Sequence, residues 1–186
     1  MAAWHDGWRN WRPLRRTGFA RHQGGAVAVE FGLLAIPFFM IVGAILETSL
    51  MFLSSQVLET AVQDSSRLIR TGQVQTEGLD AAAFRTRLCD RTFGLFGDCS
   101  GVFIDVAPLD DFNAATISPP VNQTCVSDCP WVGTQRYQTG SRNSYVLVQA
   151  YYRWPVLLNF AAFGMSSLPD GTRLLGSAST FRNEPF

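Results

Sequence analysis

The sequence contains no lysine, and its two histidines, His5 and His22, both lie within the first 25 residues. The rest of the chain therefore offers neither an imidazole nor an amine to act as a general base or nucleophile near neutral pH. Only carboxylate chemistry would remain, which excludes most hydrolase mechanisms and most metal sites. We therefore expect a protein that is not an enzyme and that holds no metal and no cofactor.

Positive charge is also scarce beyond the N-terminus. Residues 1–25 carry five arginines and one aspartate, which gives +4, whereas the remaining residues carry ten arginines and fourteen acids, which gives −4. A mildly acidic chain without a basic stripe is unsuited to nucleic acid, so we expect no nucleic-acid partner. An arginine-rich leader before an apolar segment is instead a topology signal: the leader stays in the cytoplasm and the following part is exported.

Charge is nearly absent from residues 26–46, AVAVEFGLLAIPFFMIVGAIL, where Glu30 is the sole ionisable side chain. At a rise of ~1.5 Å per residue a helix of this length spans ~30 Å, the thickness of a bilayer core. It exceeds the ~7–15 residues of a secretory signal core, and no small-residue cleavage site follows it. Pro37 is tolerated in a membrane helix because neighbouring groups satisfy the freed carbonyl. The segment therefore predicts a single-pass membrane helix.

Glu30 is costly within this span, by about 2.5–3.5 kcal/mol at the centre of a bilayer, and such acids are usually paired and functional. One interpretation places Glu30 near the cytoplasmic face, where it reaches the lipid headgroups. The other begins from a cut after Gly25, which would make Ala26 the amino terminus and Glu30 the fifth residue. The carboxylate could then neutralise its own terminus, or pair with the terminus of a packed neighbour and fix the axial register.

The junction Gly25-Ala26-Val27-Ala28-Val29-Glu30-Phe31 resembles the class III signal of type IV pilins, in which a basic leader ends in glycine and the fifth residue is glutamate. Within that superfamily it resembles the TadE-like group of the tight-adherence (Tad/Flp) pilus system, with its arginine-rich leader, G-A-x-A-V-E-F box and a proline, here Pro37. The last residues, ASTFRNEPF, also resemble the ending common in this family.

This resemblance implies a minor pseudopilin needed to assemble or initiate the pilus. It implies processing between Gly25 and Ala26 by a prepilin peptidase, and an assembly role for Glu30 and Phe31. The implied partners are the major Flp pilin, a second TadE-like pseudopilin, the inner-membrane Tad assembly machinery and membrane lipid. The alternative from another class is an uncleaved signal-anchored protein whose periplasmic domain binds a ligand or acts as a scaffold.

Helical periodicity continues past the membrane segment. Residues 47–71 lack glycine and proline, and their apolar side chains recur at helical spacing: Leu50, Leu53, Val57, Ala61 and Leu68, with Leu58, Val62 and Ile69 beside them. Gly72 then ends the pattern. One helix over 26–71 is expected, the alternative being two helices broken near 47–49. We divide the chain into a leader (1–25), a transmembrane helix (26–53) and a periplasmic domain (54–186) that includes an amphipathic helix (54–71).

The rest of the chain predicts a small antiparallel sheet. A second short helix is expected over 78–91, and the β-branched and aromatic residues predict strands near 102–106, 144–152 and 173–181. Residues 108–142 contain turn residues and predict a long loop. The fold class is therefore α+β and pilin-like, with a long N-terminal helix packed on a small antiparallel sheet.

Four cysteines, Cys89, Cys99, Cys125 and Cys129, all follow the apolar span. In an oxidising periplasm they indicate two disulfides, for which three connectivities are possible. We favour Cys89–Cys99 and Cys125–Cys129 because both close local loops. A zinc site is the alternative, although only the second pair has the spacing of a zinc arm.

Overall fold

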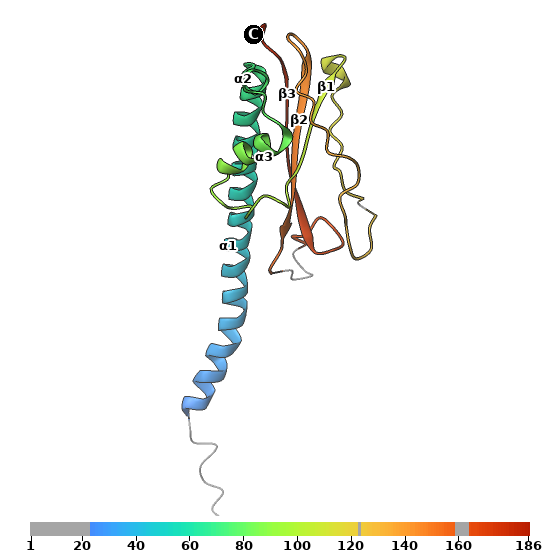
Figure 1. The fold of residues 1–186 in the computed structure, drawn as a ribbon. Coiled ribbons are helices and arrows are strands. Elements are labelled where there is room, and N and C mark those ends of the chain that lie inside the picture. Colours follow the sequence, from blue (N-terminus) through green and yellow to red (C-terminus); the bar gives the residue numbers. More distant parts are fainter. Residues whose placement is uncertain (1–22, 123, 159–163) are drawn as a thin grey trace, which may run out of the picture. The chain divides into compact units, whose positions relative to one another are not determined.

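The computed structural model describes residues 23–122, 124–158 and 164–186 (Figure 1). The chain divides into two units, one ending at Val42 and the other running from Gly43 to Phe186. One helix, α1, runs from Gln23 to Arg70 and contains Pro37. The single helix expected over 26–71 is therefore confirmed, and the alternative break near 47–49 is wrong. The helix ends where Gly72 takes a left-handed backbone conformation with φ 76°, which favours glycine.

In the second unit, α1 buries a narrow face of alternating aliphatic and small side chains. Its members recur every three or four residues: Met51, Ser54, Leu58, Ala61, Val62, Ser65, Ser66 and Ile69. The prediction that Leu50 and Leu53 lie on this face is wrong, because each is 51 % exposed. The buried face lies one residue further along, where serines take positions that a hydrophobicity pattern assigns to the outside.

Two short helices follow α1. α2 spans Gln73–Glu77, and α3 spans Ala81–Asp90 and buries Phe84 and Leu88. Asp80 begins α3 because its carboxylate accepts a hydrogen bond from the Ala83 amide at 2.7 Å, which satisfies one of the free N–H groups of the first turn. The helix expected over 78–91 is thus present, whereas the single turn of α2 was not predicted.

Three antiparallel strands form one sheet in the order β1-β2-β3. They are β1 (Phe103–Leu109), β2 (Tyr145–Pro155) and β3 (Thr172–Arg182). All three predicted strands are present; β1 and β2 each end three residues beyond the predicted bound, and β3 is one residue longer at each end. The fold class, α+β with a long helix and a small antiparallel sheet, is confirmed.

One face of the sheet carries the core of this unit. Aliphatic side chains of β1 and β2 pack there with the buried residues of α1 and α3, in a cluster that includes Leu58, Ile69, Phe84, Val106 and Val148. The other face is covered by the loop between β1 and β2, where Phe103 packs against Trp131 with ring centroids 5.4 Å apart. The predicted long loop contains one short 3₁₀ turn, Phe112–Ala114.

Candidate assembly segment and its supporting contacts

Gly25 and Ala26 lie in the first turn of α1, which begins at Gln23. The first four N–H groups of a helix have no acceptor inside it, so this turn opens at low cost. Glu30 and Phe31 follow within two turns, and both side chains are exposed. The structure gives Glu30 no hydrogen bond or ion pair with another described residue. The leader arginines lie outside the described residues.

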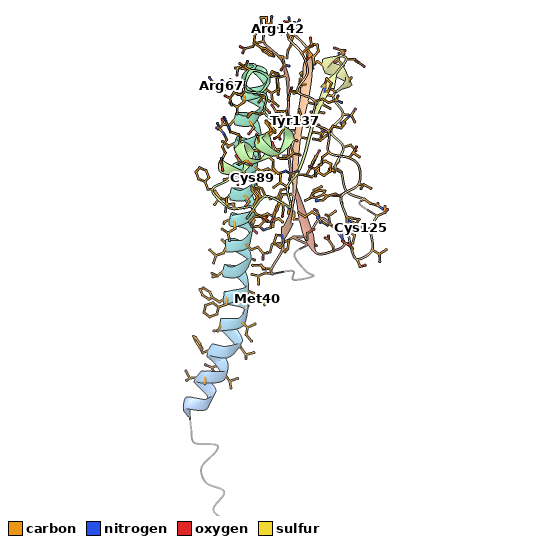
Figure 2. The ribbon with its side chains drawn as sticks, viewed as in Figure 1. Met40, Arg67, Cys89, Cys125, Tyr137 and Arg142 are labelled. Carbon is orange, nitrogen blue, oxygen red and sulfur yellow. A yellow bond between two sulfur atoms is a disulfide. The ribbon has the colours of Figure 1, made fainter. Side chains whose placement is uncertain are left out.

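The N-terminal part of α1 exposes its apolar side chains all round (Figure 2). The exposed large side chains of this stretch are Val27, Val29, Phe31, Leu33, Leu34, Ile36, Phe38, Phe39 and Ile41. An 18-residue window of this helix has a mean hydropathy of 2.3, and no other described helix is long and apolar enough to cross a membrane. Such a surface is stable only when lipid or protein covers it, so the helix is suited to anchor the chain in a membrane.

Glu47, the first acid after the apolar span, has a structural role that sequence reasoning missed. Its carboxylate is buried and accepts hydrogen bonds from the amides of Leu157 at 2.5 Å and Leu158 at 2.8 Å. These two N–H groups lie just after β2, where the strand ladder has ended and no strand acceptor remains. Glu47 therefore fixes the connection between β2 and β3 to α1. An acid directly after a long apolar run was the available signal.

The C-terminal R-N-E-P-F residues close the far end of the second unit. The buried Asn183 side chain donates from Nδ2 to the carbonyls of Thr139 and Ser141, each at 3.0 Å. The Glu184 amide donates to the Arg70 carbonyl at 2.9 Å, which satisfies one of the free carbonyls at the end of α1. The final ring, Phe186, lies so close to Gly72 that any β-carbon there would clash with it.

Both predicted disulfides are present, Cys89–Cys99 and Cys125–Cys129, and the structure has no free cysteine. The zinc alternative is wrong because all four sulfurs are paired with each other. No group of three or more potential metal ligands occurs in the part of the chain that the structure describes. The first disulfide joins α3 to the turns that follow it, and the second closes a small ring in the long loop.

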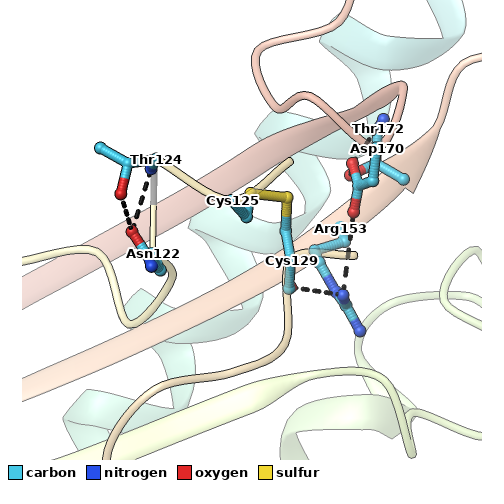
Figure 3. Close-up of a disulfide and its surroundings, with 7 residues drawn as sticks. All are labelled: Asn122, Thr124, Cys125, Cys129, Arg153, Asp170 and Thr172. Carbon is cyan, nitrogen blue, oxygen red and sulfur yellow. Dashed lines mark hydrogen bonds and ion pairs between the residues drawn. A yellow bond between two sulfur atoms is a disulfide. The ribbon is translucent and has the colours of Figure 1, made fainter. Parts of the chain in front are cut away.

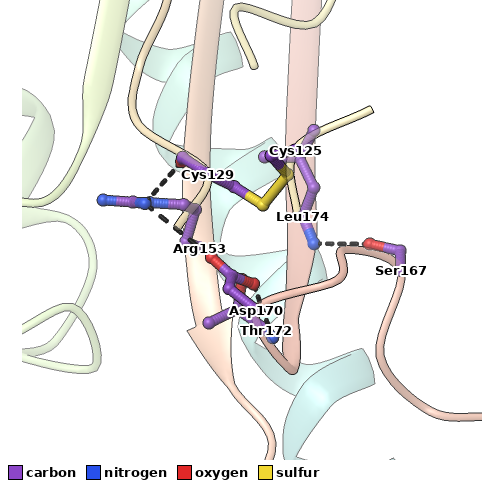
Figure 4. A network of polar contacts seen from close by, with 7 residues as sticks. All are labelled: Cys125, Cys129, Arg153, Ser167, Asp170, Thr172 and Leu174. Carbon is purple, nitrogen blue, oxygen red and sulfur yellow. Dashed lines mark hydrogen bonds and ion pairs between the residues drawn. A yellow bond between two sulfur atoms is a disulfide. The ribbon is translucent and has the colours of Figure 1, made fainter. Parts of the chain in front are cut away.

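Arg153 of β2 holds the second disulfide against the sheet (Figure 3). Its guanidinium donates to the Cys129 carbonyl at 2.6 Å and lies 3.9 Å from Asp170. Although burial raises the pKa of Asp170, hydrogen bonds from Thr172 and the charge of Arg153 outweigh that effect and lower it. Figure 4 shows the same network with the Leu174 amide donating to the Ser167 hydroxyl. The long loop and the β2–β3 turn thus share one polar anchor.

The rest of the long loop is tied to β1. Asp105 is buried and accepts hydrogen bonds from the Arg136 backbone amide at 2.9 Å and from its guanidinium at 2.6 and 3.0 Å. These bonds raise the pKa of Arg136 above its ordinary value. The Tyr137 hydroxyl donates to the Leu79 carbonyl at 3.0 Å, and burial raises the pKa of Tyr137 to about 12. Tyr137 therefore remains a neutral donor at physiological pH.

The fold and these contacts define a class of protein: an α+β domain built on the second part of a long helix whose first part is suited to a membrane. Comparison with protein families gives a more specific result. Residues 25–67 match the family described as TadE-like protein. The family resemblance predicted from the junction is therefore confirmed over the segment that carries it, and it implies involvement in the Tad pilus system. No curated protein and no solved structure matches the chain.

Proposed function

We propose that the chain is a minor pseudopilin that assembles or initiates a Tad/Flp-type pilus for surface adherence. The observation that carries this proposal is the exposed, apolar first part of α1 with a single acid, Glu30, inside the segment that matches the TadE-like family. A lone carboxylate on an apolar helix is costly in lipid. It is therefore expected to serve an interaction between subunits.

We place the processing site between Gly25 and Ala26. A prepilin peptidase would reach this bond because it lies in the first helical turn, which has few internal hydrogen bonds to break. Cleavage puts a new ammonium at the positive end of the helix dipole, which is unfavourable. Glu30 lies one turn along on the same face, where its charge offsets that ammonium. In an assembling filament the same carboxylate would pair with the terminus of a neighbouring subunit.

In this proposal residues 1–25 are a cytoplasmic leader, 26–53 span the inner membrane and 54–186 form a periplasmic domain. The partners are the prepilin peptidase, the major Flp pilin, a second TadE-like pseudopilin and the inner-membrane Tad machinery. Disulfides in the second unit support an oxidising compartment, since cytosolic thiols are kept reduced. The absence of histidine and lysine after residue 25 supports a structural role without catalysis.

The test replaces Glu30 with glutamine and follows both processing and assembly in cells that carry the Tad machinery. We expect Glu30→Gln to be exported and cleaved, because the bond at Gly25 is unchanged, and to abolish pilus formation counted by electron microscopy. Glu59→Gln is the matched control, because Glu59 is an exposed glutamate on the same helix. It should leave the pilus number unchanged.

The mass of the membrane-extracted protein tests whether the chain is cleaved after Gly25. A chain beginning at Ala26 is expected when the peptidase is active. An intact Met1 terminus in those cells, together with normal piliation by Glu30→Gln, would reject the pseudopilin proposal. That result would favour the alternative, an uncleaved signal-anchored scaffold.

A further inference from the structure

A cavity of about 430 Å³ lies beside α1 just beyond the end of its apolar span. The helix contributes residues between Thr48 and Ser55, β3 contributes Arg173–Gly176, and the connection before β3 contributes Gly164 and Met165. The whole lining belongs to the unit Gly43–Phe186. The proposed function does not use this cavity.

The position of the cavity along α1 matches the headgroup layer of a membrane. The apolar run ends at Leu46, so at ~1.5 Å per residue Thr48 lies ~3 Å and Ser55 ~14 Å further along the axis. The headgroup layer of a bilayer extends about 5–8 Å beyond the hydrocarbon core on each side. The part of the cavity lined by Thr48 and Met51 therefore lies at the depth of the phosphate groups and glycerol backbones. This step rests on the membrane anchoring in the proposed function, and not on processing or assembly.

Its lining combines apolar walls with a single cation. Met51, Phe52 and Leu174 supply apolar surface, and Arg173 is the only charged side chain among the described residues of the lining. One guanidinium nitrogen of Arg173, Nη1, donates to the Met165 carbonyl at 3.1 Å. A guanidinium carries five N–H donors, so others remain for a ligand. Such a fork matches the oxygens of a phosphodiester.

No acid competes for Arg173 inside the cavity. The nearest carboxylates along the chain are engaged elsewhere: Glu47 accepts from Leu157 and Leu158, and Asp170 accepts from Thr172. A zwitterionic headgroup would bring an ammonium into a cavity that has no carboxylate to receive it. An anionic headgroup without an ammonium leaves no such group unpaired, so the charge balance favours a net negative lipid.

The surface around the cavity is suited to lipid rather than to water. Leu50, Phe52 and Leu53 are each at least half exposed, and Leu157, beside the amides that Glu47 holds, is 85 % exposed. Phe52 is the one of these side chains that lines the cavity among the described residues, whereas Leu50 and Leu53 lie on another side of α1. In water this exposure would be unfavourable, whereas at a membrane surface the same side chains lie against acyl chains.

We propose that this cavity binds the headgroup of an anionic phospholipid from the outer leaflet of the inner membrane. Arg173 pairs with the phosphodiester, and the apolar walls cover the glycerol and the upper acyl chains. The lipid would hold the base of the exported domain at a fixed height on the membrane.

The full chain in nanodiscs containing equal amounts of phosphatidylglycerol and phosphatidylcholine provides the test. Native mass spectrometry after release counts the lipids retained by each variant. Wild type is expected to retain phosphatidylglycerol in preference to phosphatidylcholine. Arg173→Gln should retain about fivefold less, the effect of one arginine at an anionic surface. Arg173→Lys should retain part of the preference, and Arg142→Gln, which changes an exposed loop arginine outside this cavity, should match wild type.

Equal retention by wild type and a folded Arg173→Gln variant would overturn the proposal and indicate annular lipid only. Loss of retention in Arg142→Gln as well would also overturn it, because a general loss of positive charge would then explain the result. Unchanged thermal unfolding of Arg173→Gln shows that the variant is folded. Glu30→Gln should retain phosphatidylglycerol normally even where it fails to assemble, which separates this proposal from the proposed function.

Discussion

The hydrogen bonds of the Asn183 side chain explain why an asparagine stands in the C-terminal ending. The amide group donates to two backbone carbonyls of the loop before β2, while its own backbone N–H donates to Ser144 at 2.9 Å. A carboxylate of the same shape could not donate, and an apolar side chain would leave buried carbonyls without partners. The end of the chain is therefore part of the fold and does not serve as a free tail.

Replacing Asn183 with alanine is expected to lower the free energy of unfolding by about 2 kcal/mol, because two buried acceptors lose their donor. Asn183→Asp should be worse near neutral pH, since it places a negative charge against carbonyl oxygens. Thermal denaturation in detergent, followed by circular dichroism, measures both. Asn113→Ala, a change in an exposed turn, is the control and should stay within about 0.5 kcal/mol of wild type. Equal effects at the two positions would contradict the role given to Asn183.

The serines on the buried face of α1 are a second feature at the residue scale. The hydroxyls of Ser54, Ser65 and Ser66 are buried and have no hydrogen-bond partner within the described structure. A buried hydroxyl without a partner costs free energy, so these positions are not optimised for stability. Their small size brings the helix close to its neighbours, at positions where a leucine would not fit the same spacing.

At the scale of the element, the two disulfides stabilise different parts of the chain. Cys99 belongs to the main hydrophobic core with α1 and α3, whereas Cys129 belongs to a small separate cluster with Val121 and Leu168. Both rings are short, with sequence separations of 10 and 4 residues. Chain entropy alone therefore assigns about 3 and about 2 kcal/mol of stabilisation to them. The location of each ring decides which part of the chain its removal destabilises.

Removal of Cys89–Cys99 by double alanine substitution is expected to lower the global unfolding free energy by about 3 kcal/mol, measured by denaturant titration. Removal of Cys125–Cys129 should instead loosen the long loop, so that limited proteolysis cuts between residues 110 and 135. The global unfolding free energy should fall by less than in the first variant. Each double variant serves as the control for the other. Identical cleavage patterns in the two variants would show that the loop and the core do not unfold independently.

At the scale of the whole molecule, the proposed topology places the leader and the disulfide-bonded domain on opposite sides of the inner membrane. A cysteine introduced by Asn113→Cys should react with a membrane-impermeant maleimide in intact spheroplasts. A cysteine introduced by Gly7→Cys in a peptidase-deficient strain should react only after lysis. The four native cysteines are paired and give little background. Labelling of Gly7→Cys in intact spheroplasts would reverse the topology derived from the arginine leader.

Some features could be predicted from the sequence because they depend on neighbours along the chain. The long helix follows from apolar periodicity, the strands from β-branched and aromatic runs, and the disulfide pairing from the short separation of the cysteines. The helix face could not be placed correctly, because Leu50 and Leu53 are apolar yet exposed while Ser54 is polar yet buried. Burial depends on which residues pack against this face of α1, and those partners come from α3 and from the strands.

The sequence by itself determined the junction at Gly25, the length of the apolar span and the resemblance of residues 25–67 to the TadE-like family, because charge, length and spacing are properties of consecutive residues. Only the tertiary structure decided what Glu47, Asn183 and Arg173 do. Glu47 meets the amides after β2, Asn183 meets the loop before it, and Arg173 lines a cavity with α1. In each case the partners are far apart in the sequence and meet only in the folded domain.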